Sequence, residues 1–331
     1  MTVPDVVTVG EAMALLIART PGPLEAVDEF ERATAGAELN VAVGLSRLGF
    51  HVGYIGRLGQ DSPGRRLRAF MADERLDLRH LAMDARYPTG LMLKQMADGG
   101  ADPEVEYFRR GSAASHLAVR DMPAPDSDFG RARLLHLTGI CPGLSQGCRE
   151  LAFALARQAR AGGRTVSFDP NLRPRLWPSQ AAMIETVNAL ACEADIVLPG
   201  LAEGRLLTGC DDPAGIARYY LERGVRQVVV KLGPDGAWIA GAGAGVDAGI
   251  VPGVPVPRVV DTVGAGDGFA VGVISALLDG QDLRAAAARG CAIGARVVQF
   301  RGDCEGLPDR AQLAEEPARS GRMRTNMETQ T

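Results

Sequence analysis

The chain has 331 residues, of which 46% are hydrophobic and 23% charged, and its formal net charge is −4. This length predicts one large domain, or one domain with an appendage, and the hydrophobic fraction excludes disorder over most of the chain. The mild acidity gives no electrostatic reason to bind nucleic acid or an anionic membrane. Because the sequence has neither a signal peptide nor a run of about 18 apolar residues, we expect a cytoplasmic protein without a membrane span.

Two residue types are informative by their number and spacing. The six cysteines are scattered without a C-x-x-C pair, which favours reduced thiols in a reducing compartment over a zinc site. Of the 36 basic residues, only Lys94 and Lys231 are lysine. A lysine retained in so arginine-rich a chain is a candidate for a role that needs a compact ammonium group.

The first third of the chain mixes helical and strand patterns. Strands are expected over Val6–Gly10 and His51–Gly56, and helices over Ala37–Leu48 and Ser62–Arg75, with an irregular segment from Thr20 to Ala35. Farther on, Leu91–Met96 and Val105–Phe108 alternate like antiparallel strands and flank a turn at Asp98-Gly99-Gly100. These short strands predict a small β appendage built from two separated pieces.

From residue 133 onward, short apolar runs alternate with helical segments. The expected strands are Leu134–Leu137, Thr165–Phe168, Ile196–Leu198 and Gln227–Val230. The expected helices are Leu144–Arg160, Gln180–Leu190, Asp267–Leu278 and Asp282–Phe300, and the glycine-rich stretch 241–249 fits a hairpin connection better than a phosphate loop. This alternation predicts an α/β domain with a parallel sheet covered by helices on both faces.

Polar residues follow each of these four strands. They are Thr138-Gly139, the segment Asp169 to Arg173, Glu203, and Lys231-Leu232-Gly233. Each group alone is compatible with ordinary turn or surface chemistry. Ligands of parallel sheets bind beyond the carboxyl ends of the strands, so the convergence of all four favours a binding site at this edge.

The strongest local signal is Asp261-Thr262-Val263-Gly264-Ala265-Gly266-Asp267, directly before an apolar helix. Gly264 and Gly266 allow backbone N–H groups to converge at a helix N-terminus, which makes a cradle for an anion. Asp267 is then either a proton acceptor beside the cradle or simply a helix cap. Neither a dinucleotide-binding GxGxxG motif nor a Walker GxxxxGK[ST] motif occurs in the sequence.

These residues resemble the signatures of a known family. Asp261–Asp267 is similar to the DTxGAGD signature of the PfkB (ribokinase-like) carbohydrate kinases, and residues 35–49 with 56–64 are similar to the other signature. The resemblance covers about residues 5–308. Within the family, five segments are most similar to the 2-keto-3-deoxygluconate kinases. They are Gly36-Ala37-Glu38-Leu39-Asn40, Tyr107-Phe108-Arg109, residues 111–115, residues 169–173 and Arg301-Gly302-Asp303.

The resemblance implies a ribokinase-like three-layer sandwich with a mostly parallel central sheet and a small β-sheet lid. The kinase domain would span residues 1–312, the lid would come from about residues 11–35 and 87–111, and residues 313–331 would be a polar tail. The implied reaction transfers phosphate from ATP, with Mg²⁺, to the terminal hydroxyl of a sugar acid. The lid often pairs subunits in this family, which implies a homo-oligomer.

The resemblance also implies roles for individual residues. The anion hole would be formed by Gly264, Ala265 and Gly266, with Asp267 as the base. The nucleotide would be bound by Asn171, Lys231, Gly233 and Gly236 together with Gly264 and Gly266, and the sugar by Gly36, Tyr107, Arg109, Arg173 and Asp303. The metal would be assisted indirectly by Glu203. Gly200 and Cys291 stand where the family usually has asparagine.

The two arginines on the expected sugar side suit an acidic substrate, because a guanidinium group pairs with a carboxylate through two hydrogen bonds. By contrast, this chemistry needs no histidine, so His116 and His136 are expected to be structural or surface residues. Two alternatives stay open: a kinase of the same family for fructose, ribose or a related deoxy-keto acid, and a non-catalytic sugar or nucleotide binder with the same fold.

Overall fold

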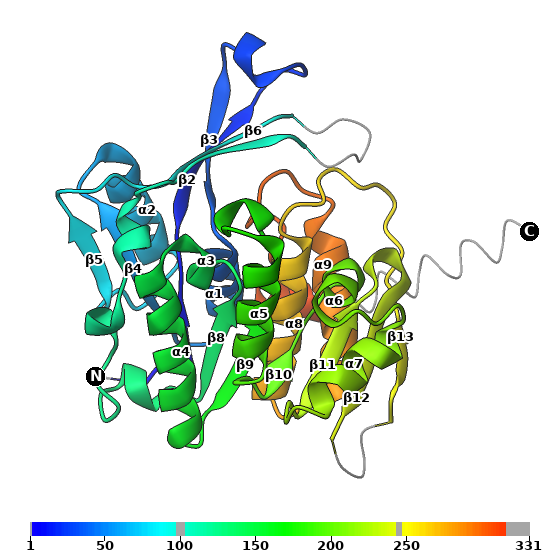
Figure 1. The fold of residues 1–331 in the computed structure, drawn as a ribbon. Coiled ribbons are helices and arrows are strands. Elements are labelled where there is room, and N and C mark those ends of the chain that lie inside the picture. Colours follow the sequence, from blue (N-terminus) through cyan, green and yellow to red (C-terminus); the bar gives the residue numbers. More distant parts are fainter. Residues whose placement is uncertain (1, 97–102, 243–246, 316–331) are drawn as a thin grey trace, which may run out of the picture.

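A computed structural model describes residues 2–96, 103–242 and 247–315. A large sheet of nine strands runs through the molecule in the order β13-β12-β11-β10-β9-β8-β1-β4-β5 (Figure 1). Its strands pair in parallel from β5 to β11, and β12 and β13 continue it antiparallel at one end. The predicted mostly parallel α/β sheet is confirmed.

The large sheet is built from short strands; the apolar runs predicted β1, β4 and β8 to β11, but not β5, β12 or β13. Its strands are β1 (Val6–Val9), β4 (Val52–Gly59), β5 (Leu81–Asp84), β8 (Leu134–Thr138), β9 (Thr165–Asp169), β10 (Ile196–Val197), β11 (Gln227–Lys231), β12 (Gly236–Gly241) and β13 (Gly249–Pro252). The helices are α1 (Ala37–Arg47), α2 (Ser62–Asp73), α3 (Cys141–Leu144), α4 (Gln146–Ala161), α5 (Gln180–Ala191), α6 (Leu201–Thr208), α7 (Pro213–Leu221), α8 (Ala265–Leu278) and α9 (Leu283–Val297).

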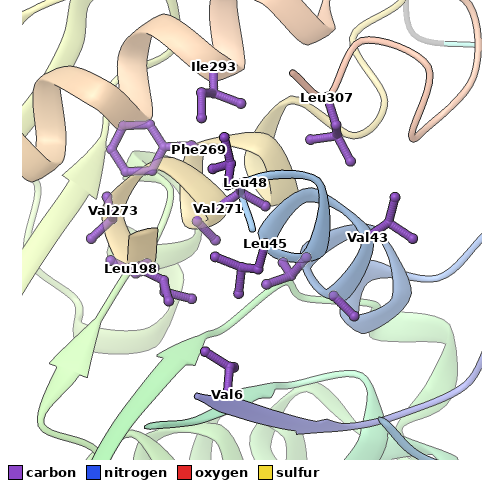
Figure 2. Close-up of a cluster of buried hydrophobic side chains, with 14 of the residues drawn as sticks. Val6, Val43, Leu45, Leu48, Leu198, Phe269, Val271, Val273, Ile293 and Leu307 are labelled. Atoms are coloured by element: carbon purple, nitrogen blue, oxygen red, sulfur yellow. The ribbon is translucent and has the colours of Figure 1, made fainter. Parts of the chain in front are cut away.

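Helices cover both faces of this sheet and make the expected three layers. Residues of α1, α2, α8 and α9 form one buried cluster with one face of the strands, and residues of α3, α4, α5, α6 and α7 form another with the opposite face. Alternate residues of β1 divide between the two clusters, as the pleat of a strand requires: Val6 belongs to the first, and Val7 and Val9 to the second. Figure 2 shows the first cluster, where Leu45 of α1 and Leu48, directly after that helix, lie close to Val271 of α8.

A separate four-stranded sheet has the order β3-β2-β6-β7. Its strands are β2 (Met13–Ala18), β3 (Phe30–Ala35), β6 (Leu91–Lys94) and β7 (Val105–Phe108), which come from the two chain segments expected to form the appendage. It stands at the top of the molecule in Figure 1, with its own small apolar cluster around Leu15. We call it the small sheet.

The structure corrects one expectation within the small sheet. The segment Thr20 to Ala35, expected to be irregular, contains the strand β3 as well as a short 3-10 turn at Leu24–Ala26. β3 lies at the edge of the sheet, and Glu31 and Arg32 in it are exposed, so it lacks the apolar run that marks a buried strand.

Several other expectations fall at the limits of the described residues. The turn expected at residues 98–100 lies outside them. The stretch 241–249 joins β12 to β13, which are antiparallel neighbours as a hairpin requires, although residues 243–246 lie outside the description. Of the expected polar tail, Leu313 packs against the first apolar cluster, and residues 316–331 are not described. Among the described helices, none is long and apolar enough to cross a membrane.

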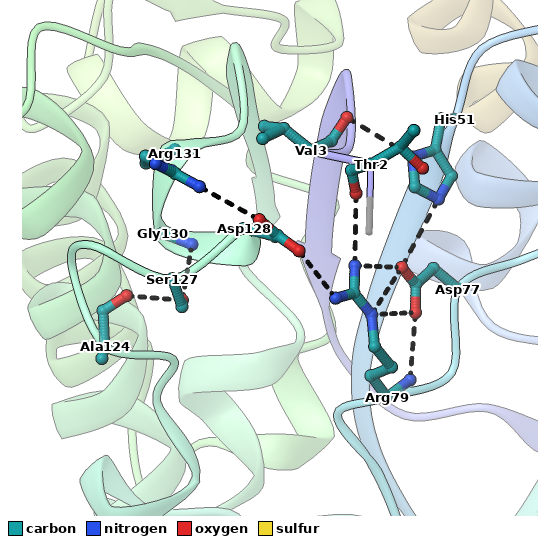
Figure 3. Close-up of polar contacts among 10 residues, drawn as sticks. All are labelled: Thr2, Val3, His51, Asp77, Arg79, Ala124, Ser127, Asp128, Gly130 and Arg131. Carbon is teal, nitrogen blue, oxygen red and sulfur yellow. Dashed lines mark hydrogen bonds and ion pairs between the residues drawn. The ribbon is translucent and has the colours of Figure 1, made fainter.

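A network of polar contacts closes the end of the sheet at which β1 and β4 begin (Figure 3). Arg79 is central to it: its Nη2 lies 2.6 Å from Oδ2 of Asp77, its Nη1 lies 2.9 Å from Oδ2 of Asp128, and it also donates to the carbonyl of Thr2. Nε2 of His51 lies 3.4 Å from Asp77. These contacts tie the chain start to the loops before β4 and β5, at the amino ends of the strands, and therefore belong to stability rather than to the predicted site.

Candidate active site

A pocket lies between the carboxyl ends of the large sheet and the small sheet. Residues from both sheets and from the loops before α1 and α8 line it. They include Glu11, Gly36, Glu38, Asn40, Met92, Tyr107, Arg109, Asn171, Arg173, Glu203, Lys231, Thr262, Gly264, Gly266, Asp267 and Asp303. The topology thus brings together most of the residues that the sequence singled out, from segments far apart in the chain.

The predicted anion cradle forms the start of α8. Gly264 has a φ of +83°, which only glycine adopts freely, and a Cβ on it would come 2.8 Å from the carbonyl oxygen of Asp303. α8 begins at Ala265, so the N–H groups of its first turn point out of the helix end toward the pocket. Nζ of Lys231 lies 3.6 Å from the position that a Cβ on Gly266 would take. A helix end and an ammonium group therefore meet at one place, which suits a phosphate group.

Asp267 sits in the first turn of α8, buried, with both carboxylate oxygens held by side chains. Nδ2 of Asn40 donates to its Oδ2 at 2.7 Å, and Nδ2 of Asn171 donates to its Oδ1 at 3.2 Å. Burial raises the pKa of Asp267 to about 7, and the nearby carboxylates of Asp169 and Asp303 act in the same direction. A carboxyl group with this pKa, held by two amides beside the cradle, is suited to accept a proton. A role as a helix cap alone would not explain why the side-chain amides of Asn40 and Asn171 both donate to this carboxylate.

Lys231 ends β11 and pairs with Asp169 at the end of the neighbouring part of the sheet. Its Nζ lies 2.7 Å from Oδ2 of Asp169. Burial alone would lower the pKa of Lys231, but the Asp169 and Glu203 carboxylates outweigh it and raise the pKa. Lys231 therefore remains a cation at the floor of the pocket.

Glu203 is fixed by the backbone rather than by a charged partner. Its Oε2 accepts the N–H of Gly200 at 2.8 Å, and its Oε1 accepts the N–H of Leu172 at 2.7 Å. Burial raises the pKa of Asp169 to about 6, with Glu203 acting in the same direction, so the two carboxylates are close enough to repel each other. Hard oxygen ligands of this kind suit Mg²⁺ that arrives with a phosphate ligand. Within the described residues, no group of three or more His, Cys, Asp or Glu side chains is arranged to hold a metal ion by itself.

The residues expected on the sugar side also line the pocket. Gly36 joins β3 to α1 with a φ of +140°, and a Cβ there would come 2.5 Å from the carbonyl oxygen of Glu11. Arg109 follows β7 and lies 5.6 Å from the centre of the Tyr107 ring. Arg173 donates to the carbonyl of Leu172 at 2.9 Å. Both arginines line the pocket, but Arg109 is already paired with Glu11.

Three expected residues do not line the pocket: Gly233, Gly236 and Ala265. Gly236 begins β12 with a φ of +102°, and a Cβ there would come 2.1 Å from the carbonyl oxygen of Val251, so the hairpin itself requires a glycine. His136 is buried beside Ser167, and burial lowers its pKa to about 3, in keeping with the expectation of a neutral structural residue.

Sequence reasoning missed Glu11, Glu38 and Asn40 as pocket residues. Asn40 and Glu38 lie in a motif that was recognised, four and two residues beyond Gly36, where the helical turn brings them toward the site. Burial raises the pKa of Glu38 to about 7, and its Oε1 accepts a hydrogen bond from Thr138 at 2.5 Å. Glu11 carries no sequence signal, because its partner Arg109 is distant in the chain.

A comparison with protein families decides the family. The model of the pfkB family carbohydrate kinases matches residues 3–310. The chain belongs to this family. The motif residues of this pfkB-family chain occupy the pocket: Gly264, Gly266 and Asp267 come from one signature, and Gly36 and Asn40 from the other.

Individual relatives agree with this assignment. The pfkB-family chain is 47% identical over 311 residues to a 2-dehydro-3-deoxygluconokinase of Bacillus subtilis, covering 94% of each chain. A crystal structure of a PfkB protein from Polaromonas sp. JS666 has a TM-score of 0.85 and 51% identity, with 94% of this chain and 99% of that one covered. Aminoimidazole riboside kinase from Salmonella enterica, complexed with aminoimidazole riboside and an ATP analog, has a TM-score of 0.79 and 27% identity, with coverage of 94% and 99%.

Proposed function

We propose that this pfkB-family enzyme phosphorylates 2-keto-3-deoxygluconate at its terminal hydroxyl, with ATP as the donor, to give 2-keto-3-deoxy-6-phosphogluconate. The observation that carries the proposal is that Arg173 and Arg109 line the same pocket as the anion cradle and Asp267. A guanidinium group facing a sugar suits a carboxylate at the end of the substrate away from the reacting hydroxyl. The 47% identity to a 2-dehydro-3-deoxygluconokinase, a kinase of this same sugar acid, supports the assignment.

In this proposal Asp267 takes the proton of the terminal hydroxyl as that oxygen attacks the γ-phosphorus of ATP. The new O–P bond forms while the bond from the γ-phosphorus to the β–γ bridging oxygen breaks, and ADP leaves with the released electron pair. The N–H groups at the start of α8 stabilise the charge on the transferring phosphoryl group, and Lys231 lies 3.6 Å from the Cβ position of Gly266 to assist them. Asn40 and Asn171 keep the Asp267 carboxylate oriented.

Magnesium would supply charge neutralisation on the ATP phosphates. Glu203, which lines the pocket with Asn171, is the carboxylate of this chain that would hold it, directly or through water. Asp169 lies behind it, buried and paired with Lys231. Of the expected nucleotide residues, Gly233 and Gly236 would shape the hairpin beside the nucleotide rather than contact the phosphates.

The small sheet is proposed to act as the lid, since Met92, Tyr107 and Arg109 reach from it into the pocket. Phe108 in its edge strand β7 is 56% exposed, which suits pairing of two chains through their lids, as expected for a homo-oligomer. A cytoplasmic location is likewise part of the proposal, as the compartment of its substrates.

A substrate panel tests the function. The purified protein is incubated with ATP and Mg²⁺ and with 2-keto-3-deoxygluconate, fructose or ribose, and a reaction without sugar is the control. The release of ADP and the formation of sugar phosphate are measured. A clear preference in kcat/KM for the sugar acid is expected. Equal or better turnover of fructose or ribose would replace the proposal with a neutral-sugar kinase, and sugar binding without turnover of any compound would favour the non-catalytic binder.

A further inference from the structure

The last residue of β6, Lys94, is a buried cation outside the pocket lining. Its side chain is 1% exposed, although it belongs to the small sheet, where it pairs with Ile17 of β2 and Val105 of β7. Burying an ammonium group is costly unless charged partners surround it. A lysine at the end of a short lid strand therefore needs an explanation in what it contacts.

The ammonium group of Lys94 is paired with two carboxylates from loops of the large domain. Nζ of Lys94 lies 2.6 Å from Oδ2 of Asp261 and 3.4 Å from Oδ1 of Asp303. Both carboxylates are buried, with 4% and 5% of their side chains exposed. The ion pairs thus join the lid to loops of the large domain on either side of the anion cradle.

Asp261 and Asp303 each shape the cradle. Oδ1 of Asp261, the oxygen that does not face Lys94, accepts the N–H of Val263 at 3.1 Å and so folds the loop that leads into Gly264. Asp303 packs its backbone against Gly264, where a Cβ would come 2.8 Å from its carbonyl oxygen, and its side chain lines the pocket. One ammonium group therefore contacts both supports of Gly264.

Two carboxylates this close repel each other unless a cation lies between them. Without an ammonium group at this place, one carboxyl group must take up a proton or move away, and either change releases a support of the cradle. The same change frees the end of β6 from the large domain.

We propose that Lys94 is a positioning residue of the phosphoryl-transfer site, which holds the lid against the anion cradle by pairing with Asp261 and Asp303. It acts through these two carboxylates, and it does not itself line the pocket. The inference builds on the proposed function, since it takes the small sheet as the lid over a sugar. If the docked lid is the form that binds sugar, losing the pairs reduces its population and weakens apparent sugar affinity in proportion.

The test compares Lys94→Met, which keeps most of the length of the side chain but not the charge, with Lys94→Arg, which keeps the charge. Gln95→Met is the matched control: Gln95 is the next residue along, and its Nε2 donates to the carbonyl of Gly22 at 2.7 Å within the lid segments. A double variant, Lys94→Met with Asp261→Asn, removes the ammonium group together with one of the two charges that it compensates. Steady-state kinetics and backbone hydrogen exchange are measured for each.

Lys94→Met should lower kcat/KM for the sugar by about 30-fold or more, through a higher KM for the sugar as the lid is released and a lower kcat as the cradle loosens, with KM for ATP changed less than about threefold. Amides of β2, β3 and β6 should exchange faster, while those of β8 and β9 stay as in the wild type. Lys94→Arg should recover most of the activity, and the double variant should be less impaired than Lys94→Met alone.

The proposal is overturned if Lys94→Met matches Gln95→Met in kinetics and in exchange of the lid amides, or if KM for ATP rises while KM for the sugar and kcat both stay as in the wild type. If Lys94→Met does not fold, the comparison of Lys94→Arg and the double variant with the wild type decides, and the absence of any recovery in either counts against the proposal. The kinetics use whichever sugar the wild type phosphorylates best, so a wrong substrate assignment and a wrong role for Lys94 give different results.

Discussion

Arg109 forms a buried ion pair with Glu11, with its Nη2 and Nε 2.5 and 2.6 Å from Oε2 of that carboxylate. Ser112 donates a hydrogen bond to the other oxygen of Glu11. The pair joins Arg109, directly after β7, to Glu11, two residues before β2, so it closes the base of the small sheet. Because Glu11 compensates the charge of Arg109, Arg173 is the pocket guanidinium best placed to meet a substrate carboxylate.

The first prediction therefore concerns Arg173. Its replacement in Arg173→Ala should lower kcat/KM for 2-keto-3-deoxygluconate by roughly 10–150-fold, the worth of a charge-assisted hydrogen bond of about 1.5–3 kcal/mol. Residual turnover of fructose should change little, because a neutral sugar has no carboxylate to lose. Steady-state rates on both sugars check this. Equal losses on both would show that Arg173 orients the site rather than selects the acid.

Arg109→Ala should act differently, because it leaves Glu11 buried and unpaired. Removing one partner of a buried ion pair typically costs about 3–5 kcal/mol, so we expect a loss of this order in the free energy of unfolding. Urea denaturation of Arg109→Ala and Arg173→Ala measures the contrast, with the half-buried Arg173 expected to cost far less. Equal stability of the two variants would mean that the Glu11 pair adds nothing to the fold.

Asp267→Asn tests the proposed base. An amide cannot accept the proton of the hydroxyl, so turnover should fall by about 10²–10⁴-fold while ATP binding, measured by calorimetry, stays close to that of the wild type. Turnover near the wild-type rate would contradict the assignment and would return Asp267 to the role of a helix cap.

The raised pKa of Asp267, about 7, predicts two pH dependences. As a base it must be ionised, so kcat/KM should rise with pH through about 7 and level off above it. In the folded chain it keeps a proton that the unfolded chain releases near its ordinary pKa of 3.8, so it costs stability increasingly as pH rises from about 4 to 7.

Asp267→Asn should therefore be more stable than the wild type at pH 8, by about 1–4 kcal/mol, and no more stable at pH 4. Thermal unfolding at the two pH values checks this sign. Glu38→Gln is the kinetic control, since burial raises the pKa of Glu38 to about 7 as well. If the rise of kcat/KM near pH 7 disappears in Glu38→Gln, the rise reports the ionisation of Glu38 and not that of Asp267.

Lys231 should act on the nucleotide side. Lys231→Ala removes the cation beside Gly266 and should raise KM for ATP by roughly 10-fold or more, with a smaller effect on KM for the sugar. The same variant leaves Asp169 without the ammonium group that lies 2.7 Å away, so the pKa of Asp169 should rise further. A larger increase in KM for the sugar than in KM for ATP would mean that Lys231 acts on the sugar rather than on the nucleotide.

The site residues that could be predicted from the sequence are those that lie next to one another in a motif or directly follow a strand. Gly264, Gly266 and Asp267 follow one another, and Lys231 and Asn171 end or follow strands whose parallel order follows from the βα alternation, so their meeting could be expected. The pair Arg109–Glu11, at the base of the small sheet, joins residues 98 positions apart. The pair Lys94–Asp303, between the small sheet and the large domain, joins residues 209 positions apart. No local pattern in the sequence encodes either pairing. Edge strand β3, in which the successive residues Glu31 and Arg32 are both exposed, left no apolar run to find.

The scarcity of lysine has a practical consequence for labelling. The side chain of Lys94 is buried and that of Lys231 is partly buried, with 1% and 17% exposed, and both amines are in ion pairs. Ordinary surface acylation by amine-reactive dyes, cross-linkers or solid supports therefore has almost no target on the described part of the chain besides the pocket. A slow acylation that coincides with inactivation, and that nucleotide prevents, would mark Lys231 and turn a common coupling reagent into an affinity probe.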